Sequence, residues 1–429
     1  MATTLERSRP AATLNEYRST AGLRSEDPEI WKLLERDRRR HNRTLNFIAS
    51  ENYASPAVLQ ALASHLNVKY AEGYPGARYY QGVGIVDEIE TLAIERAKSL
   101  FGAEHANVQP HSGSGANMAA YYGTLQLGDT ILGMDLSHGG HLTHGSPVSF
   151  SGKQYKIVSY KVRPDTEFID YDELASLARD HKPKMILAGA SAYPRILDFP
   201  AFRKIADSVG ALFMADIAHI AGLVAAGVHP NPFPYADIVT STTHKTLRGP
   251  RGGLVMCRQD LARGIDRALF PGIQGGPTLS AIAAKAVCFH EAATPDFKIY
   301  QEAIVRNAQV LADALIKHGF QLTSGGTDNH LLVIKLFDRD FTGAAFAEAL
   351  EYVGIIVSKS TVPGETRSPM QTSGVRFGTP SVTSRGATEA QMNAVARIVA
   401  EVANNIGDRK ALRALRSEVR AIADQLHPI

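Results

Sequence analysis

The alternation of short apolar runs with amphipathic helix patterns between Val86 and Thr242 restricts the fold of this chain more than any other feature. The apolar runs are about five residues long, the usual length of a buried strand, and helical periodicity follows most of them. The predicted strands lie in the segments HANVQP, DTILGMD, PKMILAGA, ALFMAD and ADIVTST. Strands that alternate with helices form a mostly parallel sheet with helices on both faces. We therefore predict an α/β fold, in which ligands bind at the carboxyl ends of the strands.

The length of 429 residues indicates one large and one smaller domain. Residues 27–41 have the pattern of an amphipathic helix with Pro28 near its start, and we assign them to an N-terminal arm over residues 1–50. The alternating pattern predicts a large domain over residues 51–300. Beyond it, strand and helix patterns mix without regular alternation, which predicts a smaller α+β domain over residues 301–429.

The charge balance argues against nucleic acid as the main partner, because 46 basic residues face 43 acidic ones and the net charge is only +3. One run, ERDRRRHNR at Glu35–Arg43, is the exception. It is either a patch for a polyanion or a helix face that meets solvent or another subunit, and the second interpretation is favoured.

Only two cysteines are present, Cys257 and Cys288, which excludes a disulfide framework and a zinc site built from several cysteines. This usage suits a reducing compartment, and we expect the cytoplasm. The first 20 residues lack the apolar segment of a secretory signal. The longest run of small apolar residues, Ala218–Val228, is well short of the roughly 20 residues of a membrane span, so no membrane association is expected.

Polar motifs follow the predicted strands and should meet in one crevice. They are HSGSGAN from His111, SHGGHLTHG with His138, His141 and His144, SAYPR with Ser191, DIAH from Asp216, and STTHK with His244 and Lys245. The Ser-Gly-Ser-Gly turn enters a helix and offers free backbone N–H groups and hydroxyls to a phosphate, although such a turn also serves as a simple helix cap. The three histidines could bind zinc, but Gly139 and Gly140 break any shared helical face, and no metal site is predicted.

Asp216 and Lys245 each have two interpretations. Asp216 either caps the next helix or holds a cationic ring nitrogen, and Lys245 alone would usually be a surface lysine. Together with the phosphate turn, they form the set that pyridoxal phosphate requires: an anion site, a carboxylate for the pyridinium and an amine for a Schiff base. We therefore predict a pyridoxal-phosphate enzyme.

Longer motifs carry a resemblance to a known family. They are IASENY, KYAEGYPGARYY, NVQPHSGSGAN, GGHLTHGSPV, SAYPR, AHIAGLVAAG, TTHKTLRGPRGG, FPGIQGGP and GVRFGTP. Through these motifs the chain resembles serine hydroxymethyltransferase, and the resemblance extends from about Pro28 to the last residue of the sequence. The resemblance implies a fold-type I pyridoxal-phosphate transferase that interconverts L-serine and tetrahydrofolate with glycine and 5,10-methylenetetrahydrofolate. It also implies a homodimer or a dimer of dimers with shared active sites.

The resemblance assigns roles to residues that match the family motifs. The implied catalytic residues are Lys245, Glu72, His244 and Tyr80. The implied cofactor-binding residues are Lys245, Asp216, His219, His141, Ser112, Gly113, Ser114, Ser191 and Tyr70, joined by Gly275 and Gly276 from a second subunit. The implied amino-acid and folate contacts are Ser50, Arg376, Glu72, Tyr80, Leu136, Gly140, Leu142, Ser368, Pro369 and Met370. A bidentate guanidinium such as that of Arg376 suits a substrate carboxylate.

Three departures from the family pattern leave the substrate open. Gln81 follows the paired tyrosines, Thr278, Leu279 and Ser280 follow the Gly-Gly-Pro, and SKSTVPGETRSP, with Ser358 and Ser360, replaces an Asn-rich loop. One alternative is therefore an enzyme of α-methylserine that produces D-alanine, and another is a folate-independent aldolase of β-hydroxy amino acids. A non-catalytic polyanion-binding protein that uses Glu35–Arg43 is an alternative of another class.

Overall fold

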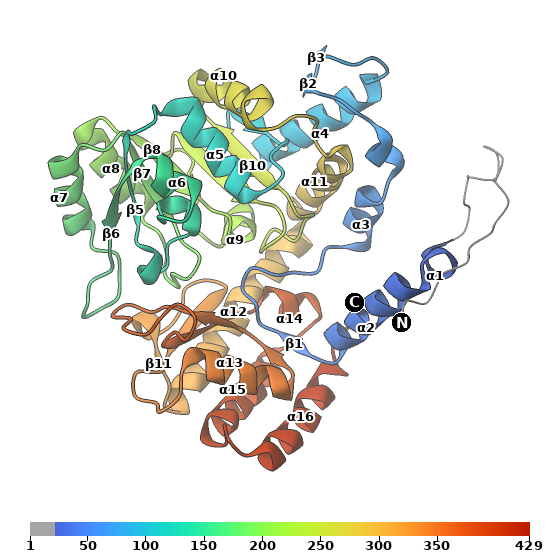
Figure 1. Ribbon diagram of the computed structural model, residues 1–429, viewed down its shortest axis with the longest axis vertical. Coiled ribbons are helices and arrows are strands. Elements are labelled where there is room, and N and C mark those ends of the chain that lie inside the picture. The colour runs from blue at the N-terminus through green and yellow to red at the C-terminus, as the bar shows by residue number, and fades with distance from the viewer. Residues whose placement is uncertain (1–21) are drawn as a thin grey trace, which may run out of the picture.

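Two sheets organise the chain in the computed structural model, which describes residues 22–429 (Figure 1). The stretch Met1–Ala21, on which the prediction about a targeting signal rests, lies outside the described residues. A seven-stranded sheet occupies the upper part of Figure 1, and a four-stranded sheet lies in the orange and red part below it. The division at residues 50 and 300 stays a prediction, because the long helix α12 (Pro295–Lys317) packs Phe297 in the larger core and Leu311 in the smaller one.

The larger sheet has the order β4-β10-β9-β8-β7-β5-β6 and is mostly parallel, as the sequence predicts. Its strands are β4 (His105–Asn107), β5 (Thr130–Met134), β6 (Lys156–Tyr160), β7 (Met185–Gly189), β8 (Leu212–Asp216), β9 (Ile238–Thr242) and β10 (Gly253–Cys257). Only β10 runs antiparallel to its neighbours β4 and β9. The sequence pattern did not predict β6 and β10.

Helices cover both faces of this sheet, as its strand pattern requires. In β7 the buried side chains alternate, so that Met185 and Leu187 face one hydrophobic cluster while Ile186 and Ala188 face the other. The first cluster includes α5 (Gly113–Thr124) and α10 (Gln259–Arg267). The second includes α4 (Gly84–Phe101), α7 (Tyr171–His181), α8 (Phe199–Val209), α9 (Ala221–Ala225) and α11 (Leu279–Ala292). Both faces are therefore covered largely by apolar packing, and many of the polar side chains lie at the strand ends.

The smaller sheet is antiparallel, in the order β11-β12-β15-β14. Its strands are β11 (Gln321–Leu322), β12 (Leu331–Lys335), β14 (Ser358–Ser360) and β15 (Gly374–Gly378). It packs with α12 and with the helices α13 (Gly343–Val353), α14 (Pro380–Ser384), α15 (Glu389–Asn404) and α16 (Arg409–Ala423). The N-terminal segment joins this part of the molecule, because β1 (Leu45–Asn46) pairs in parallel with β13 (Ile355–Ile356).

The remaining α-helices and strands of residues 22–429 lie in connecting segments. They are α1 (Leu23–Glu26), α2 (Pro28–Asn42), α3 (Pro56–Leu62), α6 (Phe150–Gln154) and the hairpin of β2 (Gly73–Tyr74) with β3 (Ala77–Arg78). In Figure 1, α1 and α2 extend to one side of the two sheets. None of the helices between residues 22 and 429 has the length and apolar character of a membrane span.

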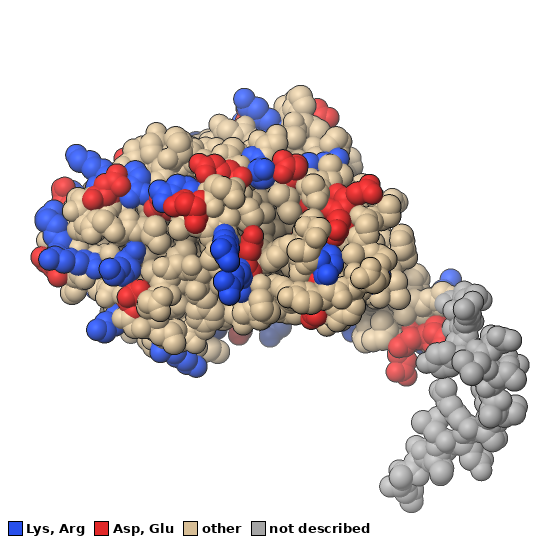
Figure 2. Space-filling view, turned by 90° about the horizontal axis from the view of Figure 1, so that it is seen from above, with Lys and Arg blue, Asp and Glu red and all other residues tan. Residues whose placement is uncertain are grey.

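Basic side chains of the run Glu35–Arg43 on α2 form ion pairs with acidic side chains of the same helix. Arg38 contacts Glu35 at 2.8 Å and Arg40 contacts Asp37 at 2.9 Å, both at the i,i+3 spacing. Figure 2 shows Lys and Arg interspersed with Asp and Glu on another face of the molecule. The ion pairs of Arg38 and Arg40 on α2 fit a helix face that meets solvent or another subunit better than a patch dedicated to a polyanion.

Candidate active site

The ends of four strands open into one cavity of about 670 Å³. It lies at the carboxyl ends of β5, β7, β8 and β9, where the sequence predicts a crevice. The structure brings the following predicted residues together in its lining: Ser50, Ser112, Gly113, Ser114, Leu136, Gly140, His141, Leu142, Ser191, Asp216, His219, His244, Lys245 and Arg376.

Lys245 reaches this cavity from the turn after β9, and its side chain is buried. The backbone carbonyl of Lys245 accepts a hydrogen bond from Asn52 Nδ2 at 2.9 Å, which fixes the turn. Its Nζ makes no hydrogen bond or ion pair within residues 22–429, so the amine stays available. Burial lowers the pKa of the amine from 10.5 to about 8, although the charge of Asp216 acts in the opposite direction.

The hydroxyls around Lys245 hold the neighbouring backbone. Thr246 Oγ1 donates to the carbonyl of His219 at 2.8 Å and accepts from the N–H of Gly222 at 2.9 Å. Thr240 Oγ1 donates to Asn117 Oδ1 at 2.6 Å. These buried bonds link β9 and the turn after it to α9 and α5, and they explain the hydroxyl-rich sequence before and after the lysine.

Asp216 ends β8 and accepts three hydrogen bonds. They come from Asn117 Nδ2 at 2.9 Å, from His144 Nε2 at 3.0 Å and from the N–H of Ala218 at 3.0 Å. Burial raises the pKa of this carboxyl, but the bond and charge of His144 outweigh burial and hold the pKa below its ordinary value. Asp216 is therefore ionised and can partner a protonated ring nitrogen.

The Ser-Gly-Ser-Gly turn forms the N-terminus of α5, where Ser112 Oγ caps the helix by accepting from the N–H of Gly115 at 3.1 Å. A side chain at Gly113 is excluded, because its Cβ would lie 2.6 Å from Thr242 Cγ2. The free N–H groups and hydroxyls at this positive helix end suit a phosphate.

A buried lysine supports the segment before this turn. Lys285 Nζ donates to the carbonyls of Val108, Pro110 and Gly253 at 2.6, 3.1 and 2.8 Å. Its position in the apolar helix α11 gave no sign of this role in the sequence.

Three imidazoles that line the cavity, those of His141, His219 and His244, are neutral. Burial lowers the pKa of His141 to about 4 and that of His219 well below its ordinary value. His219 stacks on His330, with Nδ1 and Nε2 3.2 Å apart. Burial also lowers the pKa of His244 to about 3. His330 was not predicted, because its motif GTDNH follows no strand of the larger sheet.

Arg376 enters the cavity from β15 of the smaller sheet. Its Nη1 donates to the carbonyl of Ser191 at 2.5 Å and its Nε to Ser358 Oγ at 3.3 Å. Burial lowers the pKa of this guanidinium to about 10. Ser358, one of the sequence departures, thus touches the predicted carboxylate clamp.

Eight predicted site residues do not line this cavity, and five of them cluster elsewhere in the structure: Glu72, Tyr70, Tyr80, Gly275 and Gly276. Tyr80 Oη donates to Glu72 Oε2 at 3.3 Å, and the rings of Tyr70 and Tyr80 lie 5.1 Å apart. Both tyrosines are exposed.

The predicted folate contacts Ser368, Pro369 and Met370 are also absent from the lining, and Met370 is exposed. Lys359, which lines the cavity, donates to the Met370 carbonyl at 2.8 Å.

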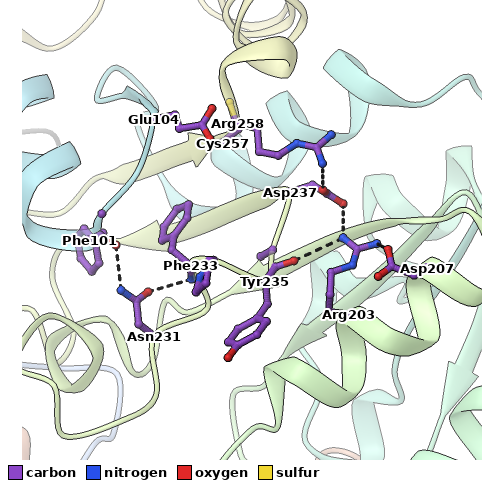
Figure 3. A pocket seen from close by; sticks show the side chains of 13 residues that line it. Phe101, Glu104, Arg203, Asp207, Asn231, Phe233, Tyr235, Asp237, Cys257 and Arg258 are labelled. Atoms are coloured by element: carbon purple, nitrogen blue, oxygen red, sulfur yellow. Dashed lines mark hydrogen bonds and ion pairs between the residues drawn. The ribbon is translucent and has the colours of Figure 1, made fainter.

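A second cavity, of about 460 Å³, opens away from the strand ends, beside Asp237 at the start of β9 (Figure 3). Asp237 pairs there with Arg203 at 2.9 Å and Arg258 at 2.6 Å, and Arg203 also pairs with Asp207 at 2.6 Å. Because these charges neutralise one another, we interpret this network as structural. No group of three metal-ligating side chains occurs between residues 22 and 429.

The cavity around Lys245 fits pyridoxal phosphate. It combines an amine of lowered pKa, an ionised carboxylate, a helix N-terminus for the phosphate and neutral imidazoles that can pack against a ring. Comparison with known families agrees: the family model described as serine hydroxymethyltransferase matches residues 23–399 of the chain.

Proposed function

The chain belongs to the serine hydroxymethyltransferase family of pyridoxal-phosphate-dependent hydroxymethyltransferases, and we propose that it interconverts L-serine and tetrahydrofolate with glycine and 5,10-methylenetetrahydrofolate. The observation that supports this most is that Lys245, Asp216 and Arg376 line one cavity. An amine, a carboxylate and a guanidinium in one cavity match a cofactor aldehyde, a ring nitrogen and an amino-acid carboxylate.

Lys245, Asp216, His141 and the Ser112–Ser114 turn would hold the cofactor. When bound, pyridoxal phosphate supplies an aldehyde for amines and a ring that accepts the electron pair left when the Cα–Cβ bond of the substrate breaks. Asp216, kept ionised by His144 and Asn117, would hold a proton on the ring nitrogen and so deepen this electron sink. With a pKa of about 8, Lys245 has a substantial neutral fraction near neutral pH and can act as a nucleophile.

Arg376 would bind the amino-acid carboxylate. Ser191 and Ser358 hold its guanidinium at 2.5 and 3.3 Å, so that it is oriented before the substrate arrives. Ser50 lies in the same lining and could add a hydroxyl contact. Leu136 and Leu142, both partly exposed at the rim, would offer an apolar surface to the pteridine of the folate.

We propose that a second copy of the chain supplies five of the residues that the cavity of one protomer lacks, namely the cluster of Glu72, Tyr70, Tyr80, Gly275 and Gly276. Glu72, with Tyr80 at its side, would then move the proton of the substrate hydroxyl, and Gly275 and Gly276 would add N–H groups to the phosphate. Exposed apolar side chains in the same region support a subunit contact: Leu59, Leu62, Val68, Ile85 and Leu92. A homodimer with shared sites, or a dimer of such dimers, follows from this proposal. The two cysteines, buried and unpaired, suit the reducing cytoplasm that we propose as its compartment.

The test is the exchange of α-protons with deuterated water, followed by NMR for glycine and for D-alanine, each with and without tetrahydrofolate. We expect glycine to exchange faster than D-alanine and tetrahydrofolate to accelerate that exchange. In parallel, serine should yield methylenetetrahydrofolate. A preference for D-alanine would identify an enzyme of α-methylserine, and exchange indifferent to folate would identify an aldolase. These two alternatives are tested because Ser358, a departure from the family pattern, contacts Arg376, the proposed ligand of the substrate carboxylate.

A further inference from the structure

The side chain of Gln274 joins two loops that the proposed function assigns to different active sites. Its Oε1 accepts a hydrogen bond from the N–H of His111 at 3.0 Å, and its Nε2 donates to the carbonyl of Gln109 at 3.1 Å. His111 directly precedes Ser112, the cap of the phosphate turn in the same protomer. Gln274 directly precedes Gly275 and Gly276, which would serve the partner's phosphate.

A second contact joins the same two loops. Burial lowers the pKa of the His111 imidazole, and the charge of Lys285 lowers it further, while a hydrogen bond to the backbone of Gly276 acts in the opposite direction. Gly276 in turn packs on Tyr70, since a Cβ on this glycine would lie 3.1 Å from the tyrosine ring.

The loop that carries Glu72 rests on the same segment. Gln109 Nε2 donates to the carbonyl of Gly73 at 2.9 Å, and Arg78 Nη1 donates to the same carbonyl at 2.8 Å. A Cβ on Gly275 would lie 3.0 Å from Glu72 Oε1, so the two loops are also in direct contact. The segment 109–111 therefore leads into the phosphate turn of the same protomer. It also contacts the loop that carries Glu72 and the loop that carries Gly275 and Gly276, both of which would serve the partner.

We propose that Gln274 is a positioning residue for two cofactor sites at once. In its own protomer it orients the segment that leads into Ser112–Ser114, and across the dimer it orients the Gly275 and Gly276 N–H groups toward the partner's phosphate. Loss of its two hydrogen bonds leaves the two loops held by fewer contacts, and each site then has to order more of its donors when the phosphate binds. This inference rests on the proposed sharing of sites between two copies.

The experiment uses heterodimers made by co-expression of two differently tagged protomers. One protomer carries Lys245→Ala, so that only the other, the reading protomer, can bind the cofactor covalently. Gln274→Met is then placed either in the reading protomer or in its partner. Pyridoxal phosphate is titrated into the apoenzyme, borohydride fixes it on the lysine, and mass spectrometry counts it on the reading protomer. Gln274→Ala repeats the series should the methionine disturb folding.

We expect both placements to weaken cofactor binding by between about twofold and tenfold, the usual range for one neutral hydrogen bond. Gln321→Met, a control on the exposed residue of β11, should leave the affinity unchanged in either placement. The inference would be overturned if Gln274→Met weakened cofactor binding in only one of the two placements, or in neither. Sedimentation is run first, because a monomer would overturn the sharing of sites and the inference with it. The titration contains no amino acid or folate, so a failure of the proposed serine reaction leaves its outcome unaffected.

Discussion

The Nε2 of His144 lies 3.0 Å from Oδ2 of Asp216, and the two side chains are 1% and 10% exposed. This buried contact holds the pKa of Asp216 low against the effect of burial, which acts in the opposite direction. The histidine therefore controls the charge that the cofactor ring nitrogen would meet, although it would not have to touch the substrate.

His144→Phe should weaken cofactor binding. The ring volume is roughly kept, but Asp216 loses a charge-assisted hydrogen bond, which is worth about 1.5–3 kcal/mol, or roughly 10- to 150-fold in the dissociation constant. Titration of the apoenzyme with pyridoxal phosphate, followed by visible absorbance, measures this constant. His138→Phe is the matched control, because His138 belongs to the same loop but its Nδ1 contacts the N–H of Val162 at 3.4 Å. Equal affinities in the two variants would contradict the role of His144.

Lys245→Ala should abolish the visible absorbance of covalently bound cofactor and reduce turnover by several orders of magnitude, because the other lysine of the lining, Lys359, is hydrogen-bonded to a backbone carbonyl. Lys359→Ala provides the comparison. Lys359 lines the same cavity, but its Nζ is occupied by the carbonyl of Met370 at 2.8 Å, so this variant should retain the absorbance. Normal turnover in Lys245→Ala would refute the assignment of the site.

The attachment of cofactor to Lys245 should depend on pH with a midpoint near 8. Burial lowers the pKa of the amine from 10.5 to about 8, and only the neutral amine attacks an aldehyde. The neutral fraction at pH 7 is then about 10%, compared with less than ~0.1% for an unperturbed lysine. Stopped-flow absorbance of apoenzyme mixed with cofactor should show a rate that rises to a plateau above pH 8–9. A rate that keeps rising to pH 10 would contradict the lowered pKa.

The sequence predicted the strands that carry the site because their apolar runs stand between clear helix patterns. It did not predict β6, whose residues at the sheet edge are largely half-buried or exposed, or β10, whose apolar run follows the Gly-rich loop after Lys245. A five-residue run in such a setting is compatible with a strand or with the start of a helix. The carboxyl ends of the strands in a parallel sheet lie at the same edge. The proximity of Asp216, His141 and Lys245 was therefore predictable from their positions at or just after the predicted strands in the sequence.

The partners of these residues were harder to predict, because packing brings them together across long stretches of sequence. Asn117 and Asp216 are 99 positions apart, and His219 and His330 are 111 positions apart. No local pattern indicates that an asparagine in a helix will orient an aspartate at the end of a distant strand. The location of Glu72 outside this cavity likewise has no signal in the periodicity of the chain.

Lys285→Met should destabilise the apoprotein. The ammonium satisfies three buried carbonyls, those of Val108, Pro110 and Gly253, and an unsatisfied buried acceptor costs about 1–3 kcal/mol. We expect the free energy of unfolding, measured by urea titration, to fall by at least about 3 kcal/mol. Lys298→Met, on the exposed face of α12, should change it by less than ~0.5 kcal/mol. A loss as small as that of the control would mean that the carbonyls find other partners.

Arg376→Lys should raise the KM for serine and leave cofactor binding unchanged. A lysine keeps one positive charge but cannot present two parallel N–H groups to a carboxylate, nor can it keep both contacts to Ser191 and Ser358. Loss of one charge-assisted hydrogen bond corresponds to roughly 10- to 150-fold in KM. Steady-state kinetics with serine, together with the cofactor titration, separate the two effects. Arg367→Lys is the control, because Arg367 lies between β14 and β15, does not line the cavity, and donates to the carbonyl of Phe341 at 3.0 Å. Serine methyl ester lacks the carboxylate charge. If Arg376→Lys raised the KM for serine and for its methyl ester by the same factor, Arg376 would act on something other than the carboxylate. The orientation of the amino acid in this cavity would then have to be reversed.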